Sequence, residues 1–337
     1  MKARDALSAW TMRCMAPGPN RWTARAWLAL LRPASHVYGG AVSLRNALFA
    51  HGLATVRRLP VPVVSVGNLV VGGTGKTPFV EMVARRLHER GHQIAILLRG
   101  YRGGSAKPAI ICDGRGLLAA PPTAADEAYL LGRRLRGVSV LTGANRYQVG
   151  QLALAHLGSG IILLDDGFQH RGLHRDLDIV LIDGGNPFGY GRLLPSGLLR
   201  EPPEALARAD LVVITHADLG HDLDATRRSI RRYAPTTPIA LAVHRPLSVI
   251  GWDGAELPAH SLSGQRLMAF SGIANPGRFE ATLARLGAVV LAHHAFPDHY
   301  ACSAADLEAL SAAADKAGAS MIVTTEKDLI RLGRSGS

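Results

Sequence analysis

The sequence predicts an α/β protein with a mostly parallel sheet, helices on both faces of that sheet, and a second, smaller α/β unit toward the C-terminus. Short β-branched runs alternate with helical stretches from Pro60 onward, which is the pattern of parallel strands joined by crossover helices. The run at 161–164 is apolar throughout, as is typical of a strand covered on both faces. The chain of 337 residues is long enough for about two domains, each with its own core.

The composition indicates a folded protein. Hydrophobic residues make up 47% of the chain and charged residues 19%, whereas a disordered chain has fewer apolar side chains and more charge. The three cysteines, Cys14, Cys112 and Cys302, lie far apart with no CxxC pair, which argues against a disulfide framework or a thiolate zinc site. We therefore expect a reducing, cytoplasmic setting.

The first element is a basic amphipathic helical segment, expected over residues 1–58. Residues 1–60 contain nine Lys or Arg and a single acid, Asp5, which gives +8 of the chain's net charge of +12. Large apolar side chains such as Trp22, Trp27 and Leu31 lie between these charges. This pattern predicts a helix that lies on an anionic membrane surface, and the alternative is an ordinary amphipathic helix packed on the protein's own core.

Other roles for the basic segment are disfavoured. Its longest uncharged runs, 33–44 and 46–56, fall short of the roughly 18 apolar residues that span a bilayer. Arg recurs throughout, unlike the apolar core of a cleavable signal peptide. Nucleic acid would also suit a basic end, but the sequence has neither an aromatic-bearing sheet motif nor a recognition helix, so we expect no nucleic-acid partner.

The larger domain is expected over residues 59–235 and the smaller one over 236–337. Predicted strands of the larger domain lie at 61–66, 93–98, 161–165, 179–183 and 211–215, with helices at 77–90, 126–135 and 145–157. The Gly- and Pro-rich stretch 184–203 follows the fourth strand, and we interpret it as a functional loop. Predicted elements of the smaller domain are strands at 266–271, 288–291 and 321–324 and helices at 276–286 and 304–314.

The strongest motif is a glycine-rich turn between a strand and a helix, which reads Val70-Val71-Gly72-Gly73-Thr74-Gly75-Lys76-Thr77. Glycines let backbone amides turn toward a phosphate, the Lys reaches the β- and γ-phosphates, and the Thr hydroxyl can hold Mg²⁺. The strict GxxxxGK[ST] spacing fails because Val70 stands where the first Gly belongs. The strand, turn and helix nevertheless predict a P-loop NTPase-like fold that binds nucleotide phosphates.

A second motif is the apolar strand 161–164 that ends in Asp165 and Asp166. In a phosphate-loop protein, the acid at the end of a neighbouring strand holds Mg²⁺ directly or through water. A strand that ends in Asp-Asp is equally compatible with a turn or a helix cap. Together with Lys76 and Thr77, the pair predicts a metal site.

These motifs, with others farther along the chain, resemble the tetraacyldisaccharide 4'-kinase family. The matching stretches are GGTGKTP at 72–78, RGY at 99–101, DE at 126–127, DDGFQHRGLHRDLDIVLID at 165–183, GRLLPSGLLREP at 191–202, FSGIANPGRF at 270–279, FPDH at 296–299 and TTEKD at 324–328. The resemblance covers almost the whole chain in order.

The resemblance implies an ATP-dependent lipid kinase that acts with Mg²⁺. Its substrate would be a tetraacyl glucosamine disaccharide 1-phosphate, a lipid A precursor, phosphorylated at the 4'-hydroxyl. A basic N-terminal segment would then hold the enzyme peripherally at the cytoplasmic face of the bacterial inner membrane. A different class is a membrane-associated P-loop ATPase switch that acts through a protein partner.

The resemblance also implies the catalytic residues. Asp126 matches the acid-base residue and His299 its partner, whereas their residue types alone indicate a helix N-cap and a surface histidine. Asp165 and Asp166 match the metal-associated acids. The chain departs from the family at Ala125, where the pattern GDEP often stands, so the local turn is expected to differ.

Further basic residues are expected near the phosphates. We expect Arg200 to stabilise the charge that develops during phosphoryl transfer, with Arg192 as its rival in the same loop. The remaining candidates for substrate or phosphate contacts are Arg99, His170, Arg171 and Glu201. Arg99 is equally compatible with a salt bridge inside the domain. The chain ends at Ser337, soon after TTEKD, where the family generally continues, so we expect a truncated or unusually short end.

Overall fold

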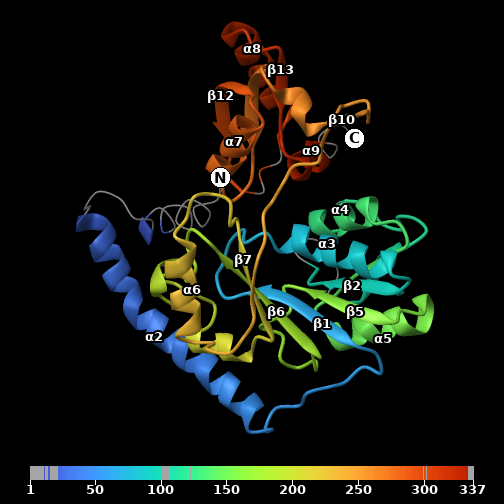
Figure 1. Ribbon diagram of the computed structural model, residues 1–337, viewed down its shortest axis with the longest axis vertical. Coiled ribbons are helices and arrows are strands. Elements are labelled where there is room, and N and C mark those ends of the chain that lie inside the picture. The colour runs from blue at the N-terminus through green and yellow to red at the C-terminus, as the bar shows by residue number, and fades with distance from the viewer. Residues whose placement is uncertain are drawn as a thin grey trace.

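The structure is a computed structural model that describes residues 22–100, 107–121, 123–298 and 302–332, together with Thr11, Cys14, Met15 and Tyr300. Within these residues the larger sheet has eight strands in the order β3-β4-β2-β5-β1-β6-β7-β8 (Figure 1). The strands are β1 Val63–Asn68, β2 Ile94–Leu98, β3 Ala109–Asp113, β4 Ser139–Thr142, β5 Ile161–Asp165, β6 Leu177–Asp183, β7 Leu211–Thr215 and β8 Ile239–Leu241. All neighbouring pairs are parallel except β3 and β4.

Helices cover both faces of this sheet. They are α3 Lys76–Glu89, α4 Asp126–Arg134, α5 Arg146–Leu157 and α6 Leu223–Arg231. Successive side chains of a strand point to opposite faces, so Ile96 of β2 packs in the core under α3 and α4, and Leu97 packs in the core under α5. The predicted fold class, a mostly parallel sheet with helices on both faces, is confirmed.

The strands of the larger sheet carry their polar residues at one edge. Asn68, Asp165, Asp183 and Thr215 are each the last residue of a strand. Because β1, β5, β6 and β7 are parallel neighbours, these four ends meet along the same edge of the sheet. The fold therefore gathers the phosphate loop and two carboxylates that are distant in the sequence.

A smaller sheet forms the C-terminal unit. Its strand β11 Arg266–Ser271 lies between β12 Val289–Ala295 and β13 Met321–Val323, and both pairs are parallel. The helices of this unit are α7 Pro276–Arg285, α8 Ala304–Ala317 and α9 Glu326–Leu332. An antiparallel pair, β9 Ser248–Ile250 and β10 Glu256–Pro258, precedes it, followed by the 3₁₀ turn η3 Ala259–Leu262. Figure 1 shows α9 on the side of this unit that faces α4.

The N-terminal segment contains a long helix, α2 Trp22–Ala50, which runs along the outside of the molecule (Figure 1) and contacts Ser196, Arg200 and Glu201. Ser35, Gly39 and Val42 are its buried residues and recur at helical spacing, so one face of α2 packs on the protein. No helix in the described part of the chain is both long and apolar enough to cross a bilayer.

Several elements differ from the sequence-based expectation. The predicted strand at 61–66 begins at Val63 and extends to Asn68. Strands β3 and β4 were not predicted, and both lie at one end of the sheet. Strand β8 was not predicted either, and it adds residues 239–241 to the larger sheet.

Candidate active site

The phosphate loop joins β1 to α3. Gly72 and Gly75 have φ values of 123° and 78°, in a region that a residue with a Cβ rarely adopts. The Thr74 side chain is buried, and its Oγ1 accepts a hydrogen bond of 2.9 Å from Asn68 Nδ2. Helix α3 starts at Lys76, so its N-terminus adds positive potential beside the loop. The loop thus has the backbone geometry of an anion-binding turn.

Asp165 ends β5, which pairs directly with the phosphate-loop strand so that Val66 lies opposite Asp165. Its side chain is buried. Burial and, to a smaller degree, the nearby carboxylate of Glu127 raise the pKa of Asp165 to about 7. The group is therefore close to half protonated at neutral pH until a cation neutralises it.

Asp166 differs from Asp165 because two cations face it. Arg200 Nη1 donates to both of its oxygens, at 2.8 and 2.7 Å, and Lys76 Nζ lies 3.6 Å from Oδ1. Burial alone would raise the pKa of Asp166, but Lys76 and Arg200 outweigh burial and hold it below its ordinary value. Asp166 is therefore ionised, and it brings the predicted phosphate lysine and the predicted catalytic arginine together.

The Gly- and Pro-rich loop folds against the phosphate loop. The Val71 amide donates to Leu198 O at 2.8 Å, and the Arg200 amide donates to Leu69 O at 2.7 Å. Within this loop, η1 Gly189–Gly191 and η2 Pro203–Arg208 are short 3₁₀ turns. The long loop therefore places Arg200 at the edge of the sheet where the parallel strands end.

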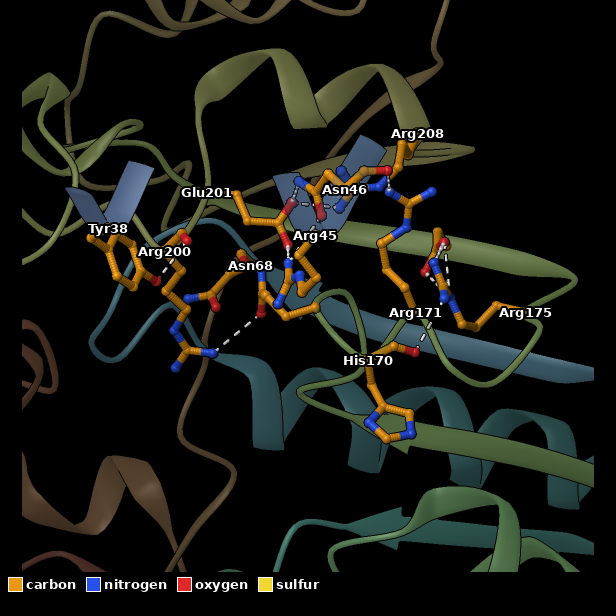
Figure 2. Close-up of polar contacts among 12 residues, drawn as sticks. Tyr38, Arg45, Asn46, Asn68, His170, Arg171, Arg175, Arg200, Glu201 and Arg208 are labelled. Atoms are coloured by element: carbon orange, nitrogen blue, oxygen red, sulfur yellow. Dashed lines mark hydrogen bonds and ion pairs between the residues drawn. The ribbon is translucent and has the colours of Figure 1, made fainter. Parts of the chain in front are cut away.

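Glu201 is fully buried beside Arg200. Its Oε1 accepts from Arg45 Nη2 at 2.8 Å, and its Oε2 accepts from Asn46 Nδ2 at 3.1 Å and from Arg208 Nη2 at 2.8 Å. A buried carboxylate needs such partners to offset its lost hydration. Glu201 thus contacts α2 and η2, and Figure 2 shows this cluster.

The two basic residues that follow the acid pair point in different directions. Arg171 Nη1 donates to Asn46 O at 2.9 Å, and its guanidinium lies 5.3 Å from the centre of the Phe49 ring, so Arg171 lies against α2. Burial and, to a smaller degree, the charge of nearby Arg146 lower the pKa of His170 to about 4, so its imidazole is neutral at pH 7. Figure 2 shows His170 directed away from the Glu201 cluster.

Arg146 is a site residue that the sequence-based argument missed. It is buried at the first position of α5, and its Nη1 donates to Gly143 O at 2.9 Å. Burial and, to a smaller degree, the neighbouring charge of Arg99 lower the pKa of Arg146 to about 10, although Asp166 and Asp165 act in the opposite direction. A cation in the first turn of the helix predicted at 145–157 is electrostatically unfavourable, and this was the available signal.

Arg99 lies exposed at the end of β2. It is close enough to Arg146 and His170 to lower the pKa of both, so it belongs to the basic side of the site. The rival arginine, Arg192, lines a cavity of about 480 Å³ beside α2 instead. The other residues that line this cavity are Met15, Arg25, Leu28, Ala29, Arg32, Tyr190 and Ser196.

Asp126 is the first residue of α4, and its Oδ2 accepts a hydrogen bond of 2.9 Å from Arg331 Nε in α9. Glu127 pairs with Lys327 at 2.9 Å. The TTEKD motif and the residues after it therefore hold the Asp-Glu pair from the C-terminal unit. The expected partner, His299, lies outside the described residues.

The C-terminal unit also touches the phosphate loop through Arg278 of α7. Its Nη2 lies 2.6 Å from Asp183 Oδ2, and its Nη1 donates to Gly73 O at 3.3 Å. Although burial acts to raise the pKa of Asp183, hydrogen bonding to His216 and the charge of Arg278 hold it far below its ordinary range. Neither Asp183 nor Arg278 was predicted as a site residue, because nothing local in the sequence pairs them.

The donor set at the phosphate loop suits Mg²⁺. The described residues contain no cluster of three or more His, Cys, Asp or Glu side chains that would hold a metal by itself. Mg²⁺ commonly takes only one or two protein ligands and fills its octahedron with water and phosphate oxygens. Asp165 and Asp166 beside the start of α3, where Thr77 lies, provide oxygen donors of this kind.

Comparisons with known proteins agree with this geometry. The family model described as "Tetraacyldisaccharide-1-P 4'-kinase" matches residues 27–337. Tetraacyldisaccharide 4'-kinase from Anaeromyxobacter sp. (strain K) is 46% identical over 321 residues, which cover 94% of this chain and 83% of the relative. The corresponding protein of Syntrophus aciditrophicus is 41% identical over 326 residues, with 94% and 87% covered.

A solved structure extends the likeness to three dimensions. The crystal structure of LpxK from Aquifex aeolicus in complex with ATP superposes with a TM-score of 0.75 and 35% sequence identity. The match covers 92% of this chain and 91% of that chain. On the strength of the family match and these relatives, the chain belongs to the tetraacyldisaccharide-1-P 4'-kinase family.

Proposed function

We propose that this member of the tetraacyldisaccharide 4'-kinase family transfers the γ-phosphoryl group of ATP to the 4'-hydroxyl of a tetraacyl glucosamine disaccharide 1-phosphate in lipid A biosynthesis. The observation that carries the proposal is the meeting of Lys76, Asp166 and Arg200 at the start of α3. A phosphate lysine, an acid and an arginine at one phosphate loop are the parts that phosphoryl transfer needs.

Asp126 is the proposed general base. As the acceptor oxygen attacks the γ-phosphorus, the bond from that phosphorus to the β,γ-bridging oxygen breaks, and the acceptor proton passes to the Asp126 carboxylate. The Arg331 guanidinium donates to Asp126 Oδ2 and so orients the Asp126 carboxylate. His299 stays a prediction as the partner of Asp126.

Lys76 and Arg200 are proposed to exchange their contacts with Asp166 for contacts with the phosphates of the nucleotide. Both side chains contact Asp166. A bound triphosphate offers them more negative charge, so Lys76 would turn to the β- and γ-phosphates and Arg200 to the transferring group. Contacts that strengthen in the transition state raise the rate, whereas uniform binding does not.

Thr77, Asp165 and Asp166 are the residues proposed to hold Mg²⁺. The ion, when bound, neutralises charge on the β- and γ-phosphates. Asp165 must lose its proton to act as a ligand, and its raised pKa makes that step sensitive to pH.

An anionic membrane surface is the proposed location of the acceptor lipid, with the enzyme peripheral at the cytoplasmic face of the bacterial inner membrane. Large apolar side chains of α2 are exposed, namely Trp22, Leu30, Val37, Leu44 and Leu48. Helical geometry puts the last four roughly opposite the buried face of Ser35, Gly39 and Val42. Arg25, Arg32 and Arg192 around the cavity beside α2 suit anionic headgroups.

The test is phosphate transfer from γ-labelled ATP to the lipid A disaccharide precursor in mixed micelles with Mg²⁺. Labelled lipid that depends on both the precursor and Lys76 supports the proposal. ATP hydrolysis without labelled lipid, even with saturating precursor, would instead identify an ATPase switch that acts through a protein partner.

A further inference from the structure

Helix α2 makes its polar contacts with the segment that carries Arg200, and this placement has a consequence for catalysis. Tyr38 OH donates to Arg200 O at 2.8 Å. About two turns farther along the helix, Arg45 and Asn46 donate to the buried Glu201 carboxylate. Figure 2 shows these three side chains of α2 directed at the Arg200–Glu201 pair.

Contacts fix both the side chain and the backbone of Arg200. Its side chain reaches Asp166 at 2.7 Å, and its backbone amide donates to Leu69 O, which immediately precedes the phosphate loop. Its carbonyl is fixed by Tyr38, and the next residue is fixed by three donors. The backbone from which the guanidinium extends is therefore set by α2 on one side and the phosphate loop on the other.

The cluster is too charged and too buried to be an incidental surface contact. Glu201 has no exposed area, and Arg208, its other cationic partner, lies 4.4 Å from the centre of the buried Phe168 ring. Phe168 belongs to the same turn as Asp166. Removing one partner of such a buried carboxylate is costly because the remaining charge stays desolvated. The cluster therefore resists displacement of α2.

We propose that α2 is a positioning element for phosphoryl transfer. Tyr38 and Arg45 are the positioning residues, because they fix the backbone at Arg200 and Glu201 and so orient the Arg200 guanidinium. The proposal rests on the proposed function, because it assigns Arg200 to the transferring phosphoryl group. Tyr38 and Arg45 act through Arg200 and Glu201 and do not touch the nucleotide. Burial raises the pKa of Tyr38, so its hydroxyl remains a donor throughout the neutral range.

The probe is ADP with aluminium fluoride, a mimic of the transferring phosphoryl group, compared with ADP alone by calorimetry in the presence of Mg²⁺. The ratio of the two affinities isolates contacts that form only with the transferring group. The probe contains no lipid, so the readout is independent of whether the chain phosphorylates the proposed acceptor.

We expect the full-length protein to prefer the fluoride complex by about 100-fold or more, and Arg200→Ala to lose most of that preference. Tyr38→Phe removes one hydroxyl and should lower the preference about threefold to tenfold, with the affinity for ADP unchanged. Arg45→Gln should lower it further, and Arg45→Lys should restore part of it. In an Arg200→Ala background, Tyr38→Phe should have no added effect.

Tyr147→Phe is the matched control, because its hydroxyl accepts a hydrogen bond from Gln151 in α5, away from this cluster. Arg45→Gln strips a partner from a buried charge and is expected to lower Tm, so Tyr38→Phe is the decisive variant. An unchanged preference in Tyr38→Phe, an equal loss with and without Arg200, or no preference in the unaltered chain would each overturn the proposal.

Discussion

Lys76 is the residue on which the proposed nucleotide binding depends most directly, because it starts α3 and its Nζ lies 3.6 Å from Asp166 Oδ1. We predict that Lys76→Ala lowers turnover by about 100-fold or more, since about 3 kcal/mol of transition-state stabilisation is lost. Its side chain is not part of a hydrophobic core, so the far-UV circular dichroism spectrum and Tm should stay close to those of the parent. Parental turnover in a folded Lys76→Ala protein would refute the phosphate-loop assignment.

Asp126 makes a separate prediction. Asp126→Asn keeps the size and the hydrogen bond to Arg331 but removes the basic oxygen, so kcat should fall at least 100-fold while the affinity for ATP changes little. His299→Ala in the Asp126→Asn background should add far less than its own single effect, because the two are predicted to act as a unit. Steady-state kinetics of the two single variants and the double variant check this, and fully multiplied losses would assign His299 an independent role.

The titration of Asp165 is expected to make the free energy of unfolding depend on pH. Its folded pKa of about 7 lies above the ordinary value of about 3.9, so the metal-free folded protein holds an extra proton between these values. The free energy of unfolding therefore falls as pH rises from about 4 to 7. Asp165→Asn does not titrate, and we predict that without metal it is more stable than the parent at pH 8 by a few kcal/mol.

Urea unfolding in EDTA at pH 5.5 and pH 8 measures this difference. His170, whose pKa is depressed to about 4, has the opposite sign and titrates in both proteins, so it cancels from the comparison. Adding Mg²⁺ should stabilise the parent more at pH 8 than at pH 5.5, because the metal requires the ionised carboxylate. A pH-independent difference between the two proteins would show that Asp165 does not carry the raised pKa.

At the scale of elements, helix α2 has one face that packs on the protein and an opposite face that is exposed. One face is fixed to the protein through Ser35, Tyr38 and Arg45, and the opposite side exposes apolar residues. We predict that changing Leu30, Val37 and Leu44 together to Gln lowers binding to anionic liposomes at least about tenfold, because their apolar area can no longer enter the interface.

Liposome co-sedimentation at low and high salt is the measurement. Salt should weaken the binding of the parent without abolishing it, because burial of apolar groups is not screened. Replacement by Gln of Leu241, Leu247 and Leu257, which are also exposed but lie outside α2, is the control and should change little. A parent protein that stays in the supernatant at both salt concentrations would assign the exposed face of α2 to another partner.

The elements that the sequence revealed best are those whose signal is local. The phosphate loop, the apolar β5 and the capped α5 each carry their pattern within about a dozen residues, and each was predicted near its observed bounds. The strands β4 and β8 are only four and three residues long and have too few positions to show a period. Their place in the sheet depends on pairing with distant strands, which periodicity does not encode.

At the scale of the whole molecule, the C-terminal unit meets the kinase site at several points. Arg278 reaches the phosphate loop and Asp183, Arg331 reaches Asp126, and Arg134 pairs with Glu326. These pairs join residues far apart in the chain, so the residue pattern does not reveal them; the resemblance to a family included TTEKD as a matching stretch but gave none of its residues a role. The sequence predicted Asp126 as a candidate catalytic residue. It did not predict that Arg331 of the C-terminal unit would contact the Asp126 carboxylate.

The most direct test of the central claim is the position of the new phosphate. The protein with Mg²⁺ and ATP should convert the tetraacyl disaccharide 1-phosphate into a 1,4'-bisphosphate, and ³¹P–¹H correlation spectra of the isolated product should connect the second phosphorus to the 4'-proton. Asp126→Asn run in parallel should give the same product far more slowly. A phosphate on any other hydroxyl, or nucleotide hydrolysis with the lipid recovered unchanged, would contradict the account.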